Sequence, residues 1–310
     1  MTVEYPRSSA IAFGSAIYRF ACYNFKVKSF GQEFYPYESL RAIRFADKTR
    51  LCDRRALVEH IASDLPQPSE MTRLRIAAKF VQRYFEHTKT QIAPPPHEQP
   101  FLRLVSRSRR ADAQIELLFL RLSQIDSVVG TLARELFHPV CVLGIAPEGF
   151  SPQSFAARNG AQLLTTEPLL TRAFILEYAR EVWNFGNRST LDRSLRVLQG
   201  AGLIARERQS ELRGHPSAFR LSAHDVSLVT FVWAFYDEWL PRATGPDFSV
   251  SPDEVANSVF ARTLLLSRAQ IEGHCQAARR HQLLASRGTQ LRLIFGNRNA
   301  LVDSLLATAL

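Results

Sequence analysis

The chain has 310 residues, of which 46% are hydrophobic and 22% charged, a composition typical of a folded globular protein with a sizeable core. Its net charge at pH 7 is +10, and arginine greatly outnumbers lysine, which favours nucleic acid or another anionic partner. The four cysteines lie far apart without a C-x-x-C pair, which argues against a disulfide framework and a zinc site. The N-terminus lacks a signal-peptide pattern and no apolar stretch is long enough for a membrane span, so we expect a cytoplasmic protein without a membrane partner.

Residues 1–93 form an aromatic-rich region that we expect to be helical or mixed. Its aromatic side chains are concentrated between Tyr18 and Tyr37 and are interleaved with cations, as in surfaces that stack on nucleic-acid bases. They show neither periodic exposure nor a known ribonucleoprotein motif, so a packed core is the favoured interpretation. The same residues would also permit a ligand pocket in this half of the chain.

Apolar periodicity predicts two helices in this region, a short one over Arg54–Ile61 and a longer one over Glu70–Gln91. The cations of the longer helix are expected to lie largely on its outside: Arg73, Lys79 and Arg83. Consecutive prolines follow, and they end the helix because proline lacks a backbone donor and disfavours helix at the preceding residue. We therefore interpret residues 94–100 as a linker.

Residues 101–150 are predicted to be a connecting helical region. A basic cluster at Arg103–Arg110 comes first, and a solvated turn and an auxiliary contact to phosphate are equally good interpretations of it. The apolar pattern of Ala111–Phe137 predicts a long helix with a kink at Gly130, either a core element or a surface for a homodimer. His138-Pro139 is expected to end this helix, and Val140–Ile145 to form a short strand or a buried loop.

Residues 151–222 carry the most informative pattern, which is a helix, a polar turn, a second helix and a basic hairpin. Ser151-Pro152 predicts a preceding first helix that runs to about Leu164, and Glu167-Pro168 predicts the next, which runs to Trp183. Apolar runs at 205–209 and 217–221 predict the two strands of the hairpin. This order is typical of a winged helix-turn-helix, which usually binds DNA and in some proteins binds a protein partner instead.

The last helix of this unit is predicted to begin at a capping box made by Ser189 and Asp192 and to end at the glycines that follow Gln199. Three leucines, Leu191, Leu195 and Leu198, fall at i, i+4 and i+7 and predict one buried stripe. The opposite face carries arginines and small polar residues. That face therefore suits contact with phosphates and base edges.

The same segment is strongly basic, since seven arginines and three acids lie between Arg188 and Arg220 and give it a net charge of +4. We expect Arg193 and Arg196 to read base edges in the major groove, and the hairpin arginines to contact the backbone or the minor groove. The candidate DNA-binding residues are Asn187, Arg188, Ser189, Thr190, Arg193, Arg196, Arg206, Arg208, Arg213, His215 and Arg220.

Residues 223–310 are expected to be a helical C-terminal region that repeats this order. A hydrophobic helix over Ser222–Leu240 is followed by capped helix starts at Ser251 and Ser267 and by a hairpin over 283–295. A second, more degenerate winged module and a plain helical cap on the first one are equally good interpretations. In the first case a second DNA-binding surface has a basic edge made of Arg279, Arg280, His281 and Arg287.

No catalytic pattern stands out. The sequence has no P-loop, dinucleotide-binding, serine-hydrolase or zinc-protease motif, and its eight histidines are scattered. His274 and Cys275 come nearest to a metal-ligand pair, but two adjacent residues do not build a tetrahedral site, so we interpret them as packed or solvated side chains. We therefore expect a protein that is not an enzyme and that uses no metal or other cofactor.

Part of the chain resembles the BrxA family of BREX phage-defence systems. The resemblance lies in Arg172–Glu177, Asn187–Leu195 and Leu198–Ile204, and in the order of elements over Thr263–Phe295. It covers the half from about Thr165 onward and leaves residues 1–150 outside. What it implies is a small helical, winged, non-enzymatic DNA-binding accessory subunit that works with other subunits of a defence system.

We thus expect a mainly α protein with one or two winged helix-turn-helix modules, short β-hairpins and an N-terminal helical or α+β domain. Its expected function is binding of double-stranded DNA, as an accessory subunit of a phage-defence or mobile-element system or as a transcriptional regulator. The alternative is a scaffold whose winged surface holds a protein partner. A steep loss of DNA binding with added salt would favour the first function over the second.

Overall fold

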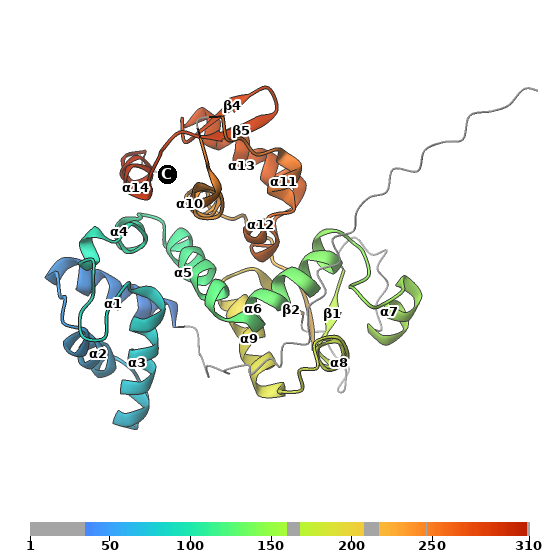
Figure 1. Ribbon diagram of the computed structural model, residues 1–310. Helices are drawn as coiled ribbons and strands as arrows, with labels where there is room; N and C mark the ends of the chain where they lie inside the picture. The colour runs from blue at the N-terminus through green and yellow to red at the C-terminus, as the bar shows by residue number, and fades with distance from the viewer. Residues whose placement is uncertain (1–34, 160–167, 208–216, 246, 309–310) are drawn as a thin grey trace, which may run out of the picture.

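The computed structural model describes residues 35–159, 168–207, 217–245 and 247–308, and Figure 1 shows the arrangement of their elements. These residues are mainly helical and also contain a three-stranded and a two-stranded antiparallel sheet. Within these ranges, no helix combines the length and the apolar character needed to cross a membrane. The prediction of a mainly α fold with small hairpins is therefore confirmed.

Three helices form the N-terminal layer: α1 (Pro36–Thr49), α2 (Arg54–Ser63) and α3 (Glu70–Tyr84). Side-chain caps begin two of them, since Asp53 accepts from the backbone N–H of Ala56 at 2.8 Å and Ser69 from that of Thr72 at 3.4 Å. The apolar periodicity of the sequence predicts the second and third of these helices. It gives no sign of α1.

Helix α3 ends at Tyr84, so the predicted extension to Gln91 is wrong. The chain turns back here, and an isolated antiparallel bridge joins His87 to Ile92. Gln99 secures the turn, because its side chain accepts from the backbone N–H of Glu86 at 2.9 Å and donates to the carbonyl of Pro94 at 2.7 Å. Residues 94–100 are accordingly a packed connection rather than an open linker: Gln99 is 2% exposed and a 3-10 turn at Pro96–Glu98 contacts α1.

The connecting region contains α4 (Pro100–Arg107), α5 (Ala111–Ile125), α6 (Ser127–Thr131) and a π-helix over Leu132–Val142. The single long helix predicted here is wrong, because the chain leaves the helical conformation at Asp126 and continues as a π-helix after Thr131. Asp126 starts α6 by accepting from the backbone N–H groups of Val128 and Val129.

The helical backbone continues past Pro139 to Val142, where the sequence predicts a strand or a loop. A π-helix is wider than an α-helix, so the ring of Pro139 does not crowd the carbonyl four residues earlier. The N–H of Leu143 accordingly donates to the carbonyl of His138, five residues before it. The prediction that His138-Pro139 ends the helix is therefore wrong.

The three-stranded sheet belongs to the unit made of residues 168–221. Its strands are β1 (Leu170–Thr171), β2 (Ile204–Glu207) and β3 (Ala218–Leu221), in the antiparallel order β1-β3-β2. Between them lie α8 (Arg172–Val182) and α9 (Arg188–Gly200). The helix predicted from Glu167-Pro168 begins only at Arg172, because Leu170 and Thr171 pair with β3 before Thr171 caps α8.

Other helices cover this unit. Helix α7 (Pro152–Asn159) packs on α8, and the rest of the helix predicted to about Leu164 falls on residues 160–167, outside the described ranges. Helix α6 packs on α9, and the π-helix packs on β3. We expected α7 to be the first helix of this unit. In the structure α6 and the π-helix also pack on the unit, against α9 and β3 (Figure 1).

The same order of elements occurs again toward the C-terminus. The second series is α10 (Leu228–Trp239), α11 (Pro252–Ala256), α12 (Val259–Thr263), α13 (Arg268–Arg280), β4 (Leu284–Arg287) and β5 (Gln290–Leu293). Val250 forms an isolated bridge with Leu291 of β5, just as β1 pairs with β3. The capping boxes predicted at Ser251 and Ser267 are confirmed, and so is the hairpin.

Helix α13 and strand β4 start 80 positions after α9 and β2 (268 against 188, and 284 against 204). The two helices also end in the same way, since the N–H groups of Leu203 and Leu283 each donate to the carbonyl five residues earlier, at 3.1 and 2.8 Å. The residue before each leucine has a positive φ, 75° at Gly202 and 56° at Gln282. The repeat therefore extends to the backbone geometry.

Helix α10 is the central helix of the C-terminal half. It begins at its cap Ser227 and not at Ser222 as predicted. The hydroxyl of Tyr236 donates to the carbonyl of Leu283 at 2.9 Å and accepts from the N–H of Ile294 at 2.8 Å. These two residues come just before β4 and just after β5, so Tyr236 holds the open end of the hairpin. A last helix, α14 (Arg298–Ala307), packs on α4, so the C-terminal half closes on the connecting region (Figure 1).

Candidate nucleic-acid interface

Helix α9 begins at Asn187, and the predicted capping box of Ser189 and Asp192 is wrong. The side-chain oxygen of Asn187 accepts from the backbone N–H of Thr190 at 3.1 Å and from the hydroxyl of Ser189 at 3.0 Å. Asparagine and serine both cap helices well, and here the turn after α8 places Asn187 at the N-cap position. The cap uses the Asn187 oxygen and leaves its amide nitrogen for an outside partner.

The inner face of α9 is as predicted. Leu191, Leu195 and Leu198 are 1%, 2% and 0% exposed, so the apolar stripe is confirmed. Thr190 belongs to the same buried side at 8% exposure. It is therefore not part of the outer surface on which we expected it.

The outer face of α9 presents three arginines. Arg188 and Arg196 are exposed, and Arg193 is half-buried. None of the three forms an ion pair with a carboxylate among the described residues, although Arg193 donates to the hydroxyl of Ser189 at 3.4 Å. This part of the helix therefore carries positive charge that the protein does not compensate locally.

The acid on this face, Asp192, is compensated. Arg172 of α8 donates to its two carboxylate oxygens at 2.8 and 2.6 Å. The hydrogen bond with Arg172 lowers the pKa of Asp192, and the charges of Arg188 and Arg196 add to this effect. The pair ties α8 to α9 and removes the negative charge that would oppose an anionic partner.

The hairpin next to α9 contributes one exposed cation in the described ranges. Arg206 of β2 is exposed and donates to the hydroxyl of Ser217 at 2.6 Å. Arg220 of β3 instead pairs across the strands with Glu207 at 2.8 Å, which offsets its charge. Arg208, Arg213 and His215 lie outside the described residues.

The second series of elements has exposed cations in different places. Arg279, Arg280 and His281 lie at the C-terminal end of α13, and Arg287 lies at the end of β4 beside Asp247 at 3.9 Å. At the positions that correspond to Arg193 and Arg196, α13 has Gly273 and Gln276. The position of Arg188 corresponds to Arg268, which pairs with Asp253 at 3.0 Å and with Glu272 at 3.2 Å. The repeat thus preserves the backbone but not the unpaired arginines of the outer face.

The basic cluster after residue 100 is largely neutralised. Arg103 pairs with Asp303, Arg107 with Asp47 at 3.3 Å, and Arg110 with Asp112. The first two pairs connect α4 to α14 and to α1. These ion pairs leave Arg109 as the exposed arginine of the cluster without a carboxylate partner in the described chain, so a contact to phosphate stays a prediction.

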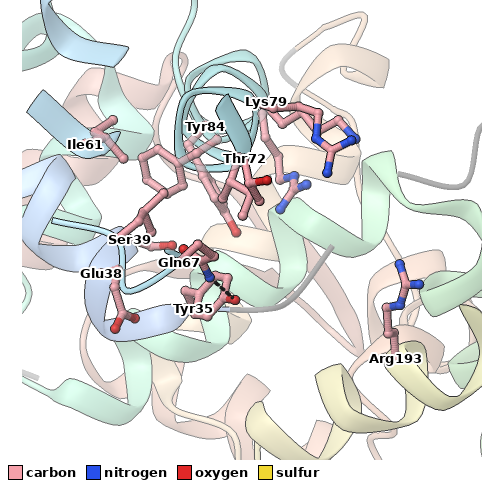
Figure 2. A pocket seen from close by; sticks show the side chains of 14 residues that line it. Tyr35, Glu38, Ser39, Ile61, Gln67, Thr72, Lys79, Tyr84 and Arg193 are labelled. Atoms are coloured by element: carbon pink, nitrogen blue, oxygen red, sulfur yellow. Dashed lines mark hydrogen bonds between the residues drawn. The ribbon is translucent and has the colours of Figure 1, made fainter. Parts of the chain in front are cut away.

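Sequence reasoning missed a group of cations on α3. Arg75, Lys79 and Arg83 line a cavity together with Arg193 of α9, and Figure 2 shows Arg193 across the cavity from Lys79. Arg83 is only 8% exposed, so its predicted position on the outside of the helix is wrong. The spacing i, i+4, i+8 was a signal for one cationic face, but nothing in the sequence indicates that α9 lies opposite.

The described side chains that often carry chemistry are mostly packed. Burial lowers the pKa of His138 to about 4 and raises those of Cys141 and Cys275 to about 12 and 11, so the imidazole is neutral and the thiols are protonated near pH 7. His274 is buried and stacks on Phe231, as we expected of a packed residue. In the described ranges, His, Cys, Asp and Glu do not gather in groups of three or more that would hold a metal ion.

This arrangement is suited to an anionic partner. The face of α9 offers three guanidinium groups without a carboxylate partner in the described chain, five and three residues apart, and the adjacent strand adds that of Arg206. Comparison with protein-family models, with curated proteins and with solved structures finds no match for this chain, so its function is inferred from these residues and their geometry.

Proposed function

We propose that this chain binds double-stranded DNA, without catalysis, through a winged-helix unit made of α8, α9, β2 and β3. The observation that carries the proposal is the set of unpaired arginines on the outer face of α9, Arg188, Arg193 and Arg196. Two other arginines of this unit, Arg172 and Arg220, have a carboxylate partner. Unpaired arginines on a helix suit phosphate and guanine edges.

The topology supports the same proposal. A strand before α8 pairs with the far strand of the hairpin, in the order β1-β3-β2, which sets the hairpin beside α9 as the wing of a winged helix lies beside its recognition helix. In this assignment Arg196 reads the major groove, Arg188 and the Asn187 amide hold phosphates, and Arg206 contacts the backbone from the hairpin. Arg193, turned toward the cavity, lies at the edge of this surface.

Comparison of the two repeats favours the first unit as the one that binds DNA in this proposal. Gly273 and Gln276 stand where the first unit has Arg193 and Arg196. Arg268, the counterpart of Arg188, pairs with Glu272 at 3.2 Å, so the outer face of α13 has less uncompensated positive charge than that of α9. A role as an accessory subunit of a phage-defence system rests on the resemblance of residues 172–204 to the BrxA family. A transcriptional regulator would use the same surface.

The test is fluorescence anisotropy of the full chain with a random-sequence DNA duplex across a salt series. We expect affinity that falls steeply with salt, and a loss of roughly 1–3 kcal/mol for each base-reading contact removed in Arg188→Ala/Arg196→Ala. The matched control is Arg279→Ala/Arg280→Ala at the end of α13, which we expect to change little. Absence of binding at low salt, or full affinity in a folded Arg188→Ala/Arg196→Ala variant, would contradict the proposal and favour the scaffold alternative.

A further inference from the structure

Helix α3 carries a row of like charges that costs stability by itself. Arg75, Lys79 and Arg83 are spaced four residues apart, so their side chains lie one above another on one face of the helix. Like charges at this spacing destabilise a helix. Among the described residues, no carboxylate pairs with Arg75 or Arg83. A row like this is retained more easily when an anion from outside neutralises it.

The row faces a cavity that a fourth cation completes. The cavity has a volume of about 530 Å³ and is lined by α1, α2, α3 and the segment between the last two, with Arg193 entering from α9 (Figure 2). Four cations and one carboxylate, that of Glu38, line it, and Glu38 already lies 4.0 Å from Arg41. The described lining therefore has a net positive charge at the point where two parts of the chain converge.

Arg83 is the most buried of the four cations that line this cavity. Its side chain is 8% exposed, and its guanidinium lies 5.8 Å from the ring centre of Tyr84, with which it shares a hydrogen bond. The buried side-chain oxygen of Gln67, also in the lining, accepts no hydrogen bond in the described chain, so a hydroxyl or amine of a ligand would satisfy it. An anion in the cavity would bring a counter-charge to cations that are partly removed from water, which favours its binding.

Lys79 lies in the same positively charged surroundings. Burial, followed by the charges of Arg75 and Arg83, lowers the pKa of its ammonium group. A phosphate between these side chains would reverse this effect, because an opposite charge within a few ångström favours the charged form.

The remaining lining limits what such an anion is. Tyr35, Phe80 and Tyr84 supply aromatic surface, while Ser39, Thr72 and Gln67 supply hydroxyl and amide groups. The volume lies in the range of sites for small molecules, roughly 300–1,000 Å³, and is too small to admit a DNA duplex. Guanidinium and ammonium groups in one site are typical of phosphate recognition.

We propose that the cavity between α3 and α9 binds a small phosphate-bearing anion, held by Arg75, Lys79, Arg83 and Arg193. Free polyphosphate and the phosphates of a nucleotide share this chemistry, and the aromatic lining favours the nucleotide. The site goes beyond DNA binding and does not depend on it. If α9 also binds DNA, the shared Arg193 couples the two ligands.

Isothermal titration calorimetry of the full chain with pyrophosphate and with ATP tests this site. We expect one site per chain, tighter for ATP if the aromatic groups take part, and roughly ten-fold or more weaker binding in Arg75→Gln/Lys79→Gln and in Arg193→Gln. The matched control, Arg41→Gln on α1, lies outside the lining and should bind both probes as the unmodified chain does. Arg196→Ala should also keep pyrophosphate binding, which separates this site from the DNA surface.

Arg83→Met gives a second measurement that does not rely on surface cations. Methionine is apolar and of similar length, so it can fill the mostly buried position of Arg83, and we expect a folded protein that binds neither probe. Absence of binding of pyrophosphate and ATP by the unmodified chain at low salt overturns the proposal. So does binding that survives both the Arg75→Gln/Lys79→Gln and the Arg83→Met changes, or a defect of the former variant in duplex DNA binding alone.

Discussion

Glu116 shows how a single buried charge is compensated in this protein. Its side chain is 1% exposed, and its carboxylate accepts from the Ser227 hydroxyl at 2.6 Å and lies 2.5 Å from Nε2 of His224. Burial opposes ionisation of this carboxyl, but the hydrogen bonds from His224 and Ser227 outweigh burial and lower its pKa. The network ties the loop before α10 to α5. The His224 ring also lies close to the turn that follows α9, because a Cβ added to Gly202 would lie 3.6 Å from it.

This pair predicts a pH-dependent contribution to stability. The hydrogen bond to Glu116, aided by the charges of Glu116, Asp112 and Asp225, raises the pKa of His224. The His224 contribution is therefore complete below its unfolded pKa of about 6.5 and is lost as pH rises through the raised folded value. The Glu116 contribution is present above its unfolded pKa of about 4.3 and is lost as pH falls through the lowered folded value.

We accordingly expect His224→Gln to reduce the free energy of unfolding more at about pH 5.5 than at about pH 8.5. Urea denaturation of the variant and of the unmodified chain at the two pH values measures this difference. His281→Gln, which alters an exposed histidine, is the control and should show no such trend. A deficit of His224→Gln that is equally large at the higher pH would mean that packing, not charge, explains the role of His224.

At the scale of elements, the start of α9 gives the next prediction. Asn187→Ala removes the oxygen that accepts from Thr190, and we expect a loss of about 1 kcal/mol in the free energy of unfolding. Ser189→Ala should cost much less, because Ser189 is exposed and does not cap the helix. Chemical denaturation of both variants distinguishes the two residues. A larger loss for Ser189→Ala than for Asn187→Ala would restore the capping box predicted from the sequence.

The middle of α13 holds a glycine that nothing in the backbone requires. A Cβ on Gly273 would meet no atom within 4 Å, and the residue lies inside a regular helix. We expect Gly273→Ala to raise the free energy of unfolding by roughly 0.5–1 kcal/mol, because alanine restricts the unfolded chain and favours helix. Gly202→Ala is the contrasting variant and should destabilise, since Gly202 has a φ of 75°. Thermal unfolding of the two variants checks the opposite signs, and equal signs would contradict the interpretation.

Elements with local signals were predictable from the sequence, and those decided by tertiary contacts were not. The capping box that starts α13 is made by residues within the helix's own first turn, so the sequence reveals it. The buried stripe of Leu191, Leu195 and Leu198 likewise follows from helical spacing. The end of α3 depends on Gln99, fifteen residues farther along the chain from Tyr84, and the burial of Arg83 depends on how α3 meets its neighbours. The same holds for the site. The arginines of α9 are evident in the sequence. That Arg193 lies near Lys79 of α3 could be seen only in the folded structure.

At the scale of the molecule, one continuous apolar core connects the described parts of the regions that we expected from the sequence. Its buried members run from Leu40 in α1 to Leu305 in α14. Helix α14 closes the arrangement, because it packs on α4 and contributes Leu301, Val302 and Leu305, which are 0%, 0% and 3% exposed. Regions that share a core in this way are expected to unfold together.

The last prediction follows from this shared core. Leu301→Ala should lower the free energy of unfolding by roughly 2–5 kcal/mol, because it removes a fully buried side chain and leaves a cavity between α14 and α4. If the core is one cooperative unit, amide hydrogen exchange should accelerate in α2 and α3 as well as in α10. Helix α14 packs mainly on α4 and α10, so faster exchange in α2 and α3 would have to come from the shared core. Thr308→Ala, at a half-buried position on the last turn, is the control and should leave exchange nearly unchanged. Faster exchange confined to α10, α13 and α14 would show instead that the N-terminal layer folds independently, and the cavity between α3 and α9 would then lie between two separately stable parts.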